Sequence, residues 1–248
     1  MKTQPRARRV LTVDIGGSHV KVLLSDMKPA RGNERRMDSN PTLTPTQMIK
    51  GVRDMTKDWE FDAVAMGYPG VVAHGQPSVE PHNLGKGWVK FDYVKALGKP
   101  VRIINDAAMQ AIGSYEGGRM LFLGLGTGLG SAMILNGVIA PMELGHLPYC
   151  KDRTFEEFVG IAGLTRLGKK QWRVAVFDVV ERLRVALEVE YVVLGGGNLA
   201  KLKELPPGTR AGDNSNAFKG GFRLWNEEPW ASDLEHATAP SQPRNKSS

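Results

Sequence analysis

The sequence has a single cysteine, Cys150, among its 248 residues, which excludes an internal disulfide and is typical of a protein in a reducing compartment. It has no apolar run that approaches the roughly 18 residues needed to span a bilayer. The basic residues 1–9 are not followed by the apolar segment and cleavage site of a signal peptide. From these absences we expect a cytoplasmic protein with no membrane attachment.

Acidic residues are too few to balance the basic ones. Lys and Arg number 33 against 26 Asp and Glu, so the net charge is +7. Residues 226–248 hold four acids and two bases, a charge of −2, so the rest of the chain has a charge of +9. A basic body favours an anionic partner such as a phosphate-rich substrate, a nucleic acid or a membrane surface. The chain lacks a recognised nucleic-acid module and interleaved aromatic and basic residues, so we expect no nucleic-acid partner.

Residues 101–130 contain the most informative pattern in the sequence. It opens with an apolar run of strand length, and Asn105 and Asp106 then cap a helix expected over AAMQAIGSYEG. A second apolar run leads into the glycine-rich turn GTGLG at 126–130. A carboxylate beside backbone amides that can hold an anion is what phosphoryl transfer to a hydroxyl uses. Taken alone, this corner fits a plain helix cap and a tight turn better.

A similar pattern occurs near the start of the chain. A strand expected over 10–15 carries Asp14 near its end, and Gly16-Gly17-Ser18 turns it into a returning strand. Two such strand–turn–strand units, at 10–24 and 120–135, predict a duplicated architecture with a ligand between its halves. Lys21, on the returning strand, fits either a role against phosphate charge or a solvent-facing position.

Capping residues and periodicity predict further elements. Thr44 caps a helix with Pro45 at its first position and Gln47 three residues after the cap. Apolar spacing predicts a long amphipathic helix over 172–187. A third glycine-rich turn, GGGN at 195–198, follows a strand. A helix is expected after it, over residues 199–205, and a closing helix or turn over 214–225.

Residues 71–90 have little apolar periodicity, so we expect a long loop, and loops of this length are often functional. Asn83 could hydrogen-bond a polyhydroxyl ligand, and Trp88 could pack against it. A turn asparagine and a half-buried tryptophan explain the two residues equally well. The organisation expected for the whole chain is a basic arm, an N-terminal lobe, a C-terminal lobe and a disordered tail, over residues 1–9, 10–104, 105–225 and 226–248.

Seven motifs, in order along residues 10–225, resemble those of the ROK family of sugar kinases. They are DIGGSHVK at 14–21, GYPG at 67–70, HNLGKGW at 82–88, NDAAMQA at 105–111, GLGTGLG at 124–130, ELGH at 143–146 and GGGN at 195–198. The resemblance implies an α/β protein with the two-lobed actin-like ATPase, or ribonuclease H-like, fold of the hexokinase type. Within the family, the compact length and the segment LGKKQWR are most similar to bacterial polyphosphate glucokinases.

The resemblance implies a reaction and a site. Inorganic polyphosphate, ATP or both would phosphorylate the 6-hydroxyl of glucose, with Asp106 as the general base and Mg²⁺ as the cofactor. Asp14 would help to hold Mg²⁺ through water. The implied sugar-binding residues are Gly70, Asn83, Asn105, Asp106, Glu143, His146 and Glu156. The implied phosphate- and nucleotide-binding residues are Asp14, Gly16, Gly17, Ser18, Lys21, Gly126, Thr127, Gly128, Gly196 and Gly197.

One segment departs from the family pattern. Many ROK proteins carry a cysteine-rich zinc motif after the ELGH-like segment, but here His146 and Cys150 supply at most two of the four ligands that a structural zinc needs. We therefore expect no structural zinc. The family's second sugar-binding glutamate lies beyond this loop, so Glu156 or Glu157 would take its place, and we favour Glu156.

The donor and the exact activity stay open at this stage. Lys169, Lys170 and Arg173 form a basic strip that we expect to guide polyphosphate, although charge alone fits a solvated helix face better. The alternatives are an ATP-only kinase for mannose, fructose or an N-acetylhexosamine, and a non-catalytic sugar-sensing ROK protein. Only nine residues precede the first expected strand, too few for a helix-turn-helix domain, so we expect an enzyme. The resemblance also implies a homodimer.

Overall fold

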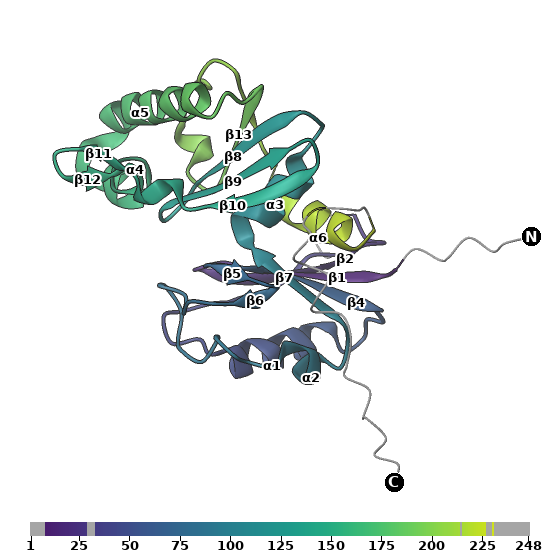
Figure 1. The fold of residues 1–248 in the computed structure, drawn as a ribbon. Helices are drawn as coiled ribbons and strands as arrows, with labels where there is room; N and C mark the ends of the chain where they lie inside the picture. The colour runs from purple at the N-terminus through teal and green to yellow at the C-terminus, as the bar shows by residue number, and fades with distance from the viewer. Residues whose placement is uncertain (1–7, 29–32, 214, 227–229, 231–248) are drawn as a thin grey trace, which may run out of the picture.

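The chain forms two lobes, each built on a five-stranded sheet (Figure 1). The computed structural model describes residues 8–28, 33–213, 215–226 and 230. Most of the expected arm, and all of the expected tail except Asn226 and Trp230, lie outside the described residues. None of the helices in the described ranges is long and apolar enough to cross a membrane.

The lower sheet is an antiparallel meander extended by parallel strands. Its order is β3-β2-β1-β4-β7, in which β1, β4 and β7 are parallel. The strands are β1 (Val10–Ile15), β2 (His19–Leu24), β3 (Arg35–Asp38), β4 (Ala63–Tyr68) and β7 (Val101–Asn105). Helices α1 (Pro45–Thr56) and α2 (Tyr93–Leu97) cover its outer face (Figure 1). The expected capping box is present, because Thr44 and Gln47 hydrogen-bond each other's backbone amides.

The upper sheet repeats this topology. Its order is β10-β9-β8-β13-β14, again a meander followed by two parallel strands, as the recurring hairpins predict. The strands are β8 (Arg119–Leu125), β9 (Leu129–Leu135), β10 (Val138–Met142), β13 (Tyr191–Gly195) and β14 (Thr209–Ala211). Smaller elements and helices complete the lobe: η1 (Leu144–His146), β11 (Pro148–Cys150), β12 (Arg153–Thr154), α4 (Phe155–Val159), α5 (Ile161–Ala186) and η2 (Leu199–Lys201).

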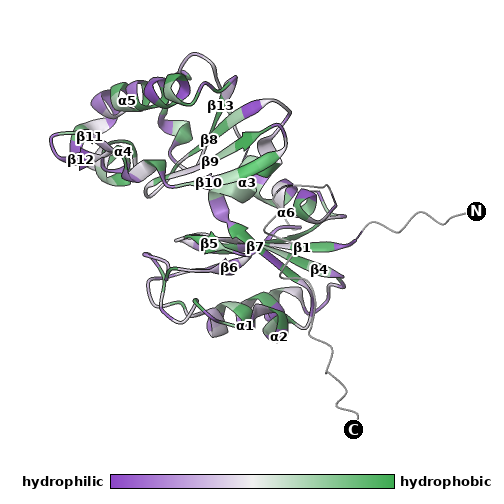
Figure 2. Ribbon diagram, viewed as in Figure 1, coloured by the Kyte–Doolittle hydropathy of each residue, from purple (hydrophilic) through white to green (hydrophobic). Residues whose placement is uncertain are grey.

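The apolar runs are strands buried on both faces. In β8, Met120 and Phe122 pack with α3 (Asp106–Ser114), whereas Leu121 and Leu123 pack with α5. A strand covered on both sides needs apolar residues at every position, so it reads as a continuous apolar run. Figure 2 shows the hydrophobic colour along the strands of both sheets.

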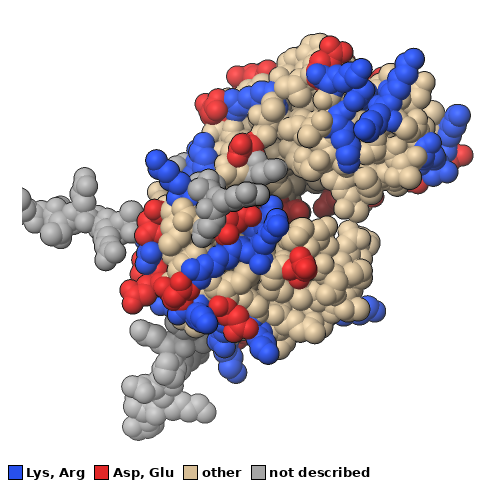
Figure 3. Space-filling view, turned by 180° about the vertical axis from the view of Figure 1, so that it is seen from behind, with Lys and Arg blue, Asp and Glu red and all other residues tan. Residues whose placement is uncertain are grey.

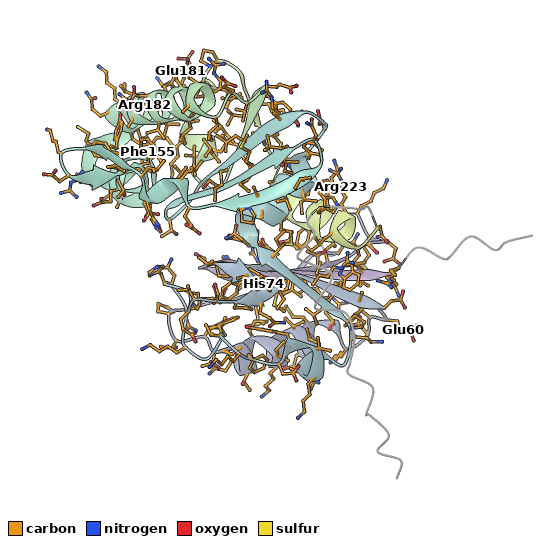
Figure 4. The ribbon with its side chains drawn as sticks, viewed as in Figure 1. Glu60, His74, Phe155, Glu181, Arg182 and Arg223 are labelled. Atoms are coloured by element: carbon orange, nitrogen blue, oxygen red, sulfur yellow. The ribbon has the colours of Figure 1, made fainter. Side chains whose placement is uncertain are left out.

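Two helices join the lobes. Helix α3 leads from β7 into the upper lobe, and α6 (Asn216–Asn226) lies between α3 and the lower sheet (Figure 1). Their backbones touch, because a Cβ on Gly113 would overlap the carbonyl of Asn216 and one on Gly220 would overlap that of Met109. Arg223, on α6 (Figure 4), donates from Nη1 to the carbonyl of Tyr115 just beyond α3, at 3.0 Å.

Three expectations about local structure are corrected. The helix expected over 199–205 is wrong, since only the short η2 forms there before the chain turns toward β14. The long helix begins at Ile161, earlier than expected, and Gly168 interrupts it with a φ of 70°, which favours glycine. The loop over 71–90 contains a small hairpin of β5 (Val72–Ala73) and β6 (Gln76–Pro77).

Candidate active site

Each lobe has one glycine-rich turn between its first two strands, and the two turns occupy equivalent places in the two sheets. The lower turn joins β1 to β2, and the upper turn joins β8 to β9. In the lower sheet Asp14 pairs with Lys21 across the hairpin and with Gly67 of β4. Seen from behind, the molecule is hollowed between the lobes, and carboxylate atoms lie inside the hollow (Figure 3).

Asp106 begins α3 directly after β7, so its backbone is fixed by both elements. Its Oδ1 accepts a hydrogen bond from the Ala107 amide at 2.8 Å. Burial raises the pKa of Asp106 to about 7, and the negative charges of Asp14 and Glu143 add to the effect. Carboxylates from two other segments of the chain therefore lie close enough to Asp106 for their charge to raise its pKa.

Asn105 holds this corner in place. Its Oδ1 accepts from the Ala108 amide as the cap of α3, and its Nδ2 donates to the carbonyl of Gly70, both at 3.1 Å. The side chain thereby ties the GYPG loop to the first turn of α3. The second N–H of Nδ2 can still donate to a ligand, so Asn105 can position the GYPG loop and also hydrogen-bond a hydroxyl.

The loop that carries Asn83 lies against the lower glycine turn. A Cβ on Gly17 would sit 3.8 Å from the Cβ of Asn83, whose side chain is exposed. Trp88 lies elsewhere: it is fully buried in the lower-lobe core, with its ring 5.9 Å from that of Tyr68. The suggestion that Trp88 packs against a ligand is therefore wrong, and the residue is structural.

The two candidate glutamates of α4 have different surroundings. Glu157 completes the capping box with Thr154 and pairs with Arg153. Glu156 lies 3.8 Å from Nε2 of His146, and its carboxylate occupies the space that a Cβ on Gly128 would need. The structure therefore brings Glu156 next to the ELGH segment and the upper glycine turn, while the carboxylate of Glu157 is used within its own helix cap.

The third glycine-rich turn packs on the second. Gly196 has a φ of 85° and lies so close to the carbonyl of Leu125 that no side chain fits. The next polar residue, Asn198, is only 5% exposed and donates from Nδ2 to the carbonyl of Gly126 at 2.8 Å. Gly197, by contrast, is exposed and has open space around its Cα.

The basic strip starts at the break in α5. Lys169 and Lys170 directly follow Gly168 and are exposed, whereas Arg173 is half-buried and its Nε donates to the carbonyl of Lys201 at 2.8 Å. Arg166, before the break, donates from Nη2 to the carbonyl of Glu157 at 2.8 Å. Figure 3 shows Lys and Arg side chains gathered over part of the upper lobe. The two lysines are thus the solvent-facing part of the strip, and Arg173 joins it to the segment after the third glycine turn.

Lys21 has a defined neighbour. It is the cross-strand partner of Asp14, and its charge lowers the pKa of that carboxyl, although burial outweighs it and leaves the pKa of Asp14 raised. Lys21 is half-buried beside the candidate phosphate turn, and its role against phosphate charge stays a prediction.

Sequence reasoning missed two residues that contact the glycine turns. Ser39, after β3, donates from Oγ to the carbonyl of Gly16 at 2.7 Å. Nothing in the polar, irregular segment 26–43 marks this serine. Asn198 is the last residue of the GGGN motif, but its bond to Gly126 depends on the packing of β13 beside β8.

The donor set at Asp14 fits Mg²⁺ and does not fit a protein-only metal cage. Within the described residues, no group of three or more His, Cys, Asp and Glu side chains is arranged to hold a metal ion. Mg²⁺ keeps several waters and commonly uses one or two carboxylates together with substrate phosphates. Asp14, beside a glycine turn and opposite Lys21, meets that requirement.

Comparison with known proteins identifies relatives of this chain. The model of the ROK family matches residues 10–152. Polyphosphate glucokinase of Mycobacterium tuberculosis is 25% identical over 212 residues, which cover 79% of this chain and 80% of that protein. Polyphosphate glucokinase of Mycobacterium leprae is 27% identical over 202 residues, 75% of this chain and 62% of that protein.

Solved structures show the same fold. The inorganic polyphosphate/ATP-glucomannokinase from Arthrobacter sp. strain KM has a TM-score of 0.73 at 24% identity, covering 87% of this chain and 97% of that one. A ROK family glucokinase from Streptomyces griseus, in complex with glucose and AMPPNP, has a TM-score of 0.69 at 14% identity, covering 89% and 100%. These likenesses confirm the expected two-lobed, hexokinase-type fold.

Proposed function

The chain belongs to the ROK family, and on that premise we propose that it is a sugar kinase that transfers a phosphoryl group from inorganic polyphosphate, ATP or both to the 6-hydroxyl of glucose. The observation that carries the proposal is the setting of Asp106, a carboxylate with a pKa raised to about 7 by burial and by Asp14 and Glu143, at the corner between β7 and α3. The similarity to mycobacterial polyphosphate glucokinases supports the choice of donor and acceptor.

Asp106 is proposed to accept the proton of the attacking hydroxyl. A general base works best when its pKa lies near the operating pH, because it is then ionised in a useful fraction and still binds the proton well. Asp14 and Glu143 act on this pKa through their charge. The bond from the Ala107 amide to Oδ1 leaves Oδ2 for the hydroxyl.

The sugar is proposed to lie between the lower loops and the ELGH segment. Asn83 and the amide of Asn105 would bind it from the lower lobe, together with the backbone at Gly70. Glu143, His146 and Glu156 would bind it from the upper lobe. A site with several fixed donors and acceptors can reject a sugar whose hydroxyl is misplaced, because a buried polar group is then left unpaired.

The phosphate chain is proposed to lie between the two glycine turns. Amides of Gly17 and Ser18 on one side, and of Thr127 and Gly128 on the other, would bind its oxygens. The amides of Gly16 and Gly126 donate within their turns, to the carbonyls of His19 and Gly128, so these two glycines would shape the turns instead. Gly196 and Gly197 would approach a nucleotide. Lys21 would offset the phosphate charge. Mg²⁺, when bound through water at Asp14, would neutralise charge on the transferred group.

The exposed strip at Lys169 and Lys170 is proposed to guide polyphosphate. A polyanion held along several cations loses affinity steeply as salt rises. ATP is compact and carries less charge, so it depends less on such a strip. Arg173 belongs to the strip but also positions the carbonyl of Lys201.

One assay tests the whole proposal. Purified protein is incubated with glucose, Mg²⁺ and either polyphosphate or ATP, and glucose 6-phosphate is measured with a coupled dehydrogenase. The Asp106→Asn variant, prepared in the same way, controls for contaminating kinases. Product from ATP alone would make the protein an ATP glucokinase. The same incubations with mannose, fructose and N-acetylmannosamine, in which the sugar phosphate is measured by mass spectrometry, test the alternative acceptors, and no product with any pair would reject the kinase.

A further inference from the structure

Each glycine turn of the candidate site is held at its first glycine by one polar side chain from another segment. Ser39 Oγ donates to the carbonyl of Gly16 at 2.7 Å, and Asn198 Nδ2 donates to the carbonyl of Gly126 at 2.8 Å. The two donors come from unrelated places, since Ser39 follows β3 and Asn198 follows β13. The same contact thus occurs in both halves of the duplicated fold.

A held carbonyl fixes the direction of the next amide. A peptide unit is planar and trans, so its C=O and N–H point in opposite directions. The bond to Gly16 therefore directs the N–H of Gly17 away from Ser39, and the bond to Gly126 directs the N–H of Thr127 away from Asn198. Among the residues that the structure describes, neither of these amides donates a hydrogen bond.

We propose that Ser39 and Asn198 are a matched pair of positioning residues, which aim the amides of Gly17 and Thr127 at the phosphate chain of the donor. The proposal rests on the proposed function, because it requires the two turns to bind a phosphoryl donor. Amides that are oriented in advance bind an anion more strongly, since no free energy is spent on turning them at the moment of binding.

Backbone contacts make each of these supports rigid. The amide of Ser39 donates to the carbonyl of Ser18, and the amide of Asn198 donates to the carbonyl of Leu125, both at 2.9 Å. Each positioning residue therefore holds its turn at two points. Asn198 is also fixed from behind, because its Oδ1 accepts from Nζ of Lys201. Because Oδ1 is directed toward Lys201, the Nδ2 of the same amide is directed toward Gly126.

Two substitutions each remove one of the hydrogen bonds that hold the glycine turns. Ser39→Ala removes the hydroxyl, and Asn198→Ala removes the N–H donated to Gly126 without adding a charge near the phosphate chain. Two control variants lose comparable bonds elsewhere. Ser25→Ala, in the lower lobe, removes an acceptor that lies 3.0 Å from the amide of Val10. Thr209→Val, in the upper lobe, removes a hydroxyl that donates to Pro206 at 2.7 Å.

Isothermal titration with tripolyphosphate, with Mg-ATP and with glucose measures binding without turnover. We expect Ser39→Ala and Asn198→Ala each to weaken the binding of both phosphate donors roughly threefold to tenfold, the range that one net hydrogen bond accounts for. Glucose affinity and the melting temperature should stay within the range of the two controls. The donor KM in the kinase assay should rise in parallel.

Wild-type donor affinity in both positioning variants would overturn the proposal, as would an equal loss in the controls. Failure of the kinase itself is distinguishable from these results. If the expected binding pattern is found but no sugar is phosphorylated, the proposed function fails and the positioning role stands. If the wild-type protein binds neither tripolyphosphate nor Mg-ATP, both are rejected.

Discussion

Asp14 and Asp106 place like charges in one site, although one lies near the end of β1 and the other at the start of α3. Burial, and next the charge of Asp14, raise the pKa of Asp106 to about 7. Neither residue has this neighbour in the unfolded chain, so the raised pKa is a property of the folded site. It bears on both turnover and stability.

Removing the proposed base should affect turnover far more than binding. In Asp106→Asn the amide oxygen still accepts from Ala107, so the corner between β7 and α3 should keep its shape. We expect kcat to fall by roughly a hundredfold or more, the usual contribution of a general base, with glucose affinity changed little. Steady-state kinetics and glucose titration measure the two. Turnover within a few-fold of wild type would show that Asp106 is not the base.

The same variant should be more stable than wild type, but only at higher pH. The pKa of Asp106 is about 7 in the folded protein against an ordinary value of 3.8 for an aspartate, so ionisation of this carboxyl lowers the free energy of unfolding as the pH rises from about 4 through 7. The amide that replaces the carboxylate in Asp106→Asn has no charge to bury. Without Mg²⁺ or sugar, we expect the variant to melt at least roughly 2 °C above wild type at pH 8, which is the shift that about 1 kcal/mol produces at this size. At pH 4 we expect the two proteins to have the same melting temperature. A pH-independent difference would contradict the assignment.

Glu156 and Glu157 provide a matched pair for the sugar site. Glu156→Gln should raise the KM for glucose at least about tenfold, because a hydrogen bond to a charged group contributes about 1.5–3 kcal/mol. Glu157→Gln should leave that KM nearly unchanged and lower the melting temperature slightly, since its carboxylate serves the cap at Thr154. Kinetics with varied glucose and thermal melts of both variants test this. The reverse pattern would assign the sugar to Glu157.

The basic strip should matter for polyphosphate and little for ATP. We expect Lys169→Ala/Lys170→Ala to raise the KM for long-chain polyphosphate severalfold more than that for ATP, and to flatten its dependence on salt. Lys50→Ala/Lys57→Ala removes two exposed charges from the region of α1 and is the control. If the control behaves like the strip variant, or if both donors suffer equally, the strip is ordinary surface.

Zinc should be absent and Mg²⁺ required. His146 and Cys150 are too few for a four-ligand zinc site, and His146 instead lies beside Glu156. Elemental analysis of dialysed protein should find well under one zinc per chain, and EDTA should abolish activity that added Mg²⁺ restores. One zinc per chain surviving dialysis would refute the first expectation.

Much of the fold could be predicted because local signals agreed with the final packing. Both strand–glycine–strand units, the capped helix at Thr44 and the strand before Asp106 form as expected. These elements are specified by turn chemistry and by apolar runs, which act over a few residues. Their recurrence predicted a duplicated architecture, and the resemblance of the seven motifs to the ROK family implied the two-lobed, hexokinase-type fold.

What could not be predicted depends on contacts between distant segments. The expected helix over 199–205 stops after one turn, where Lys201 contributes its carbonyl to Arg173 and its ammonium group to Asn198. Trp88 belongs to a segment that the sequence predicts to be a loop, yet its side chain is buried in the core of the lower lobe. The contacts of Ser39 and the difference between Glu156 and Glu157 likewise appear only when separate elements meet.

The position of α6 has a consequence for how the chain is made. All five strands of the lower sheet lie before residue 106, yet one face of that sheet is covered by a helix that starts at Asn216. A ribosome delivers the N-terminus first, and segments fold as they emerge. The lower lobe therefore has to wait until every strand of the upper sheet has been synthesised before its last layer arrives, and a chain cut short before α6 leaves the part of the sheet that α6 covers, chiefly β1, exposed to chaperones and proteases.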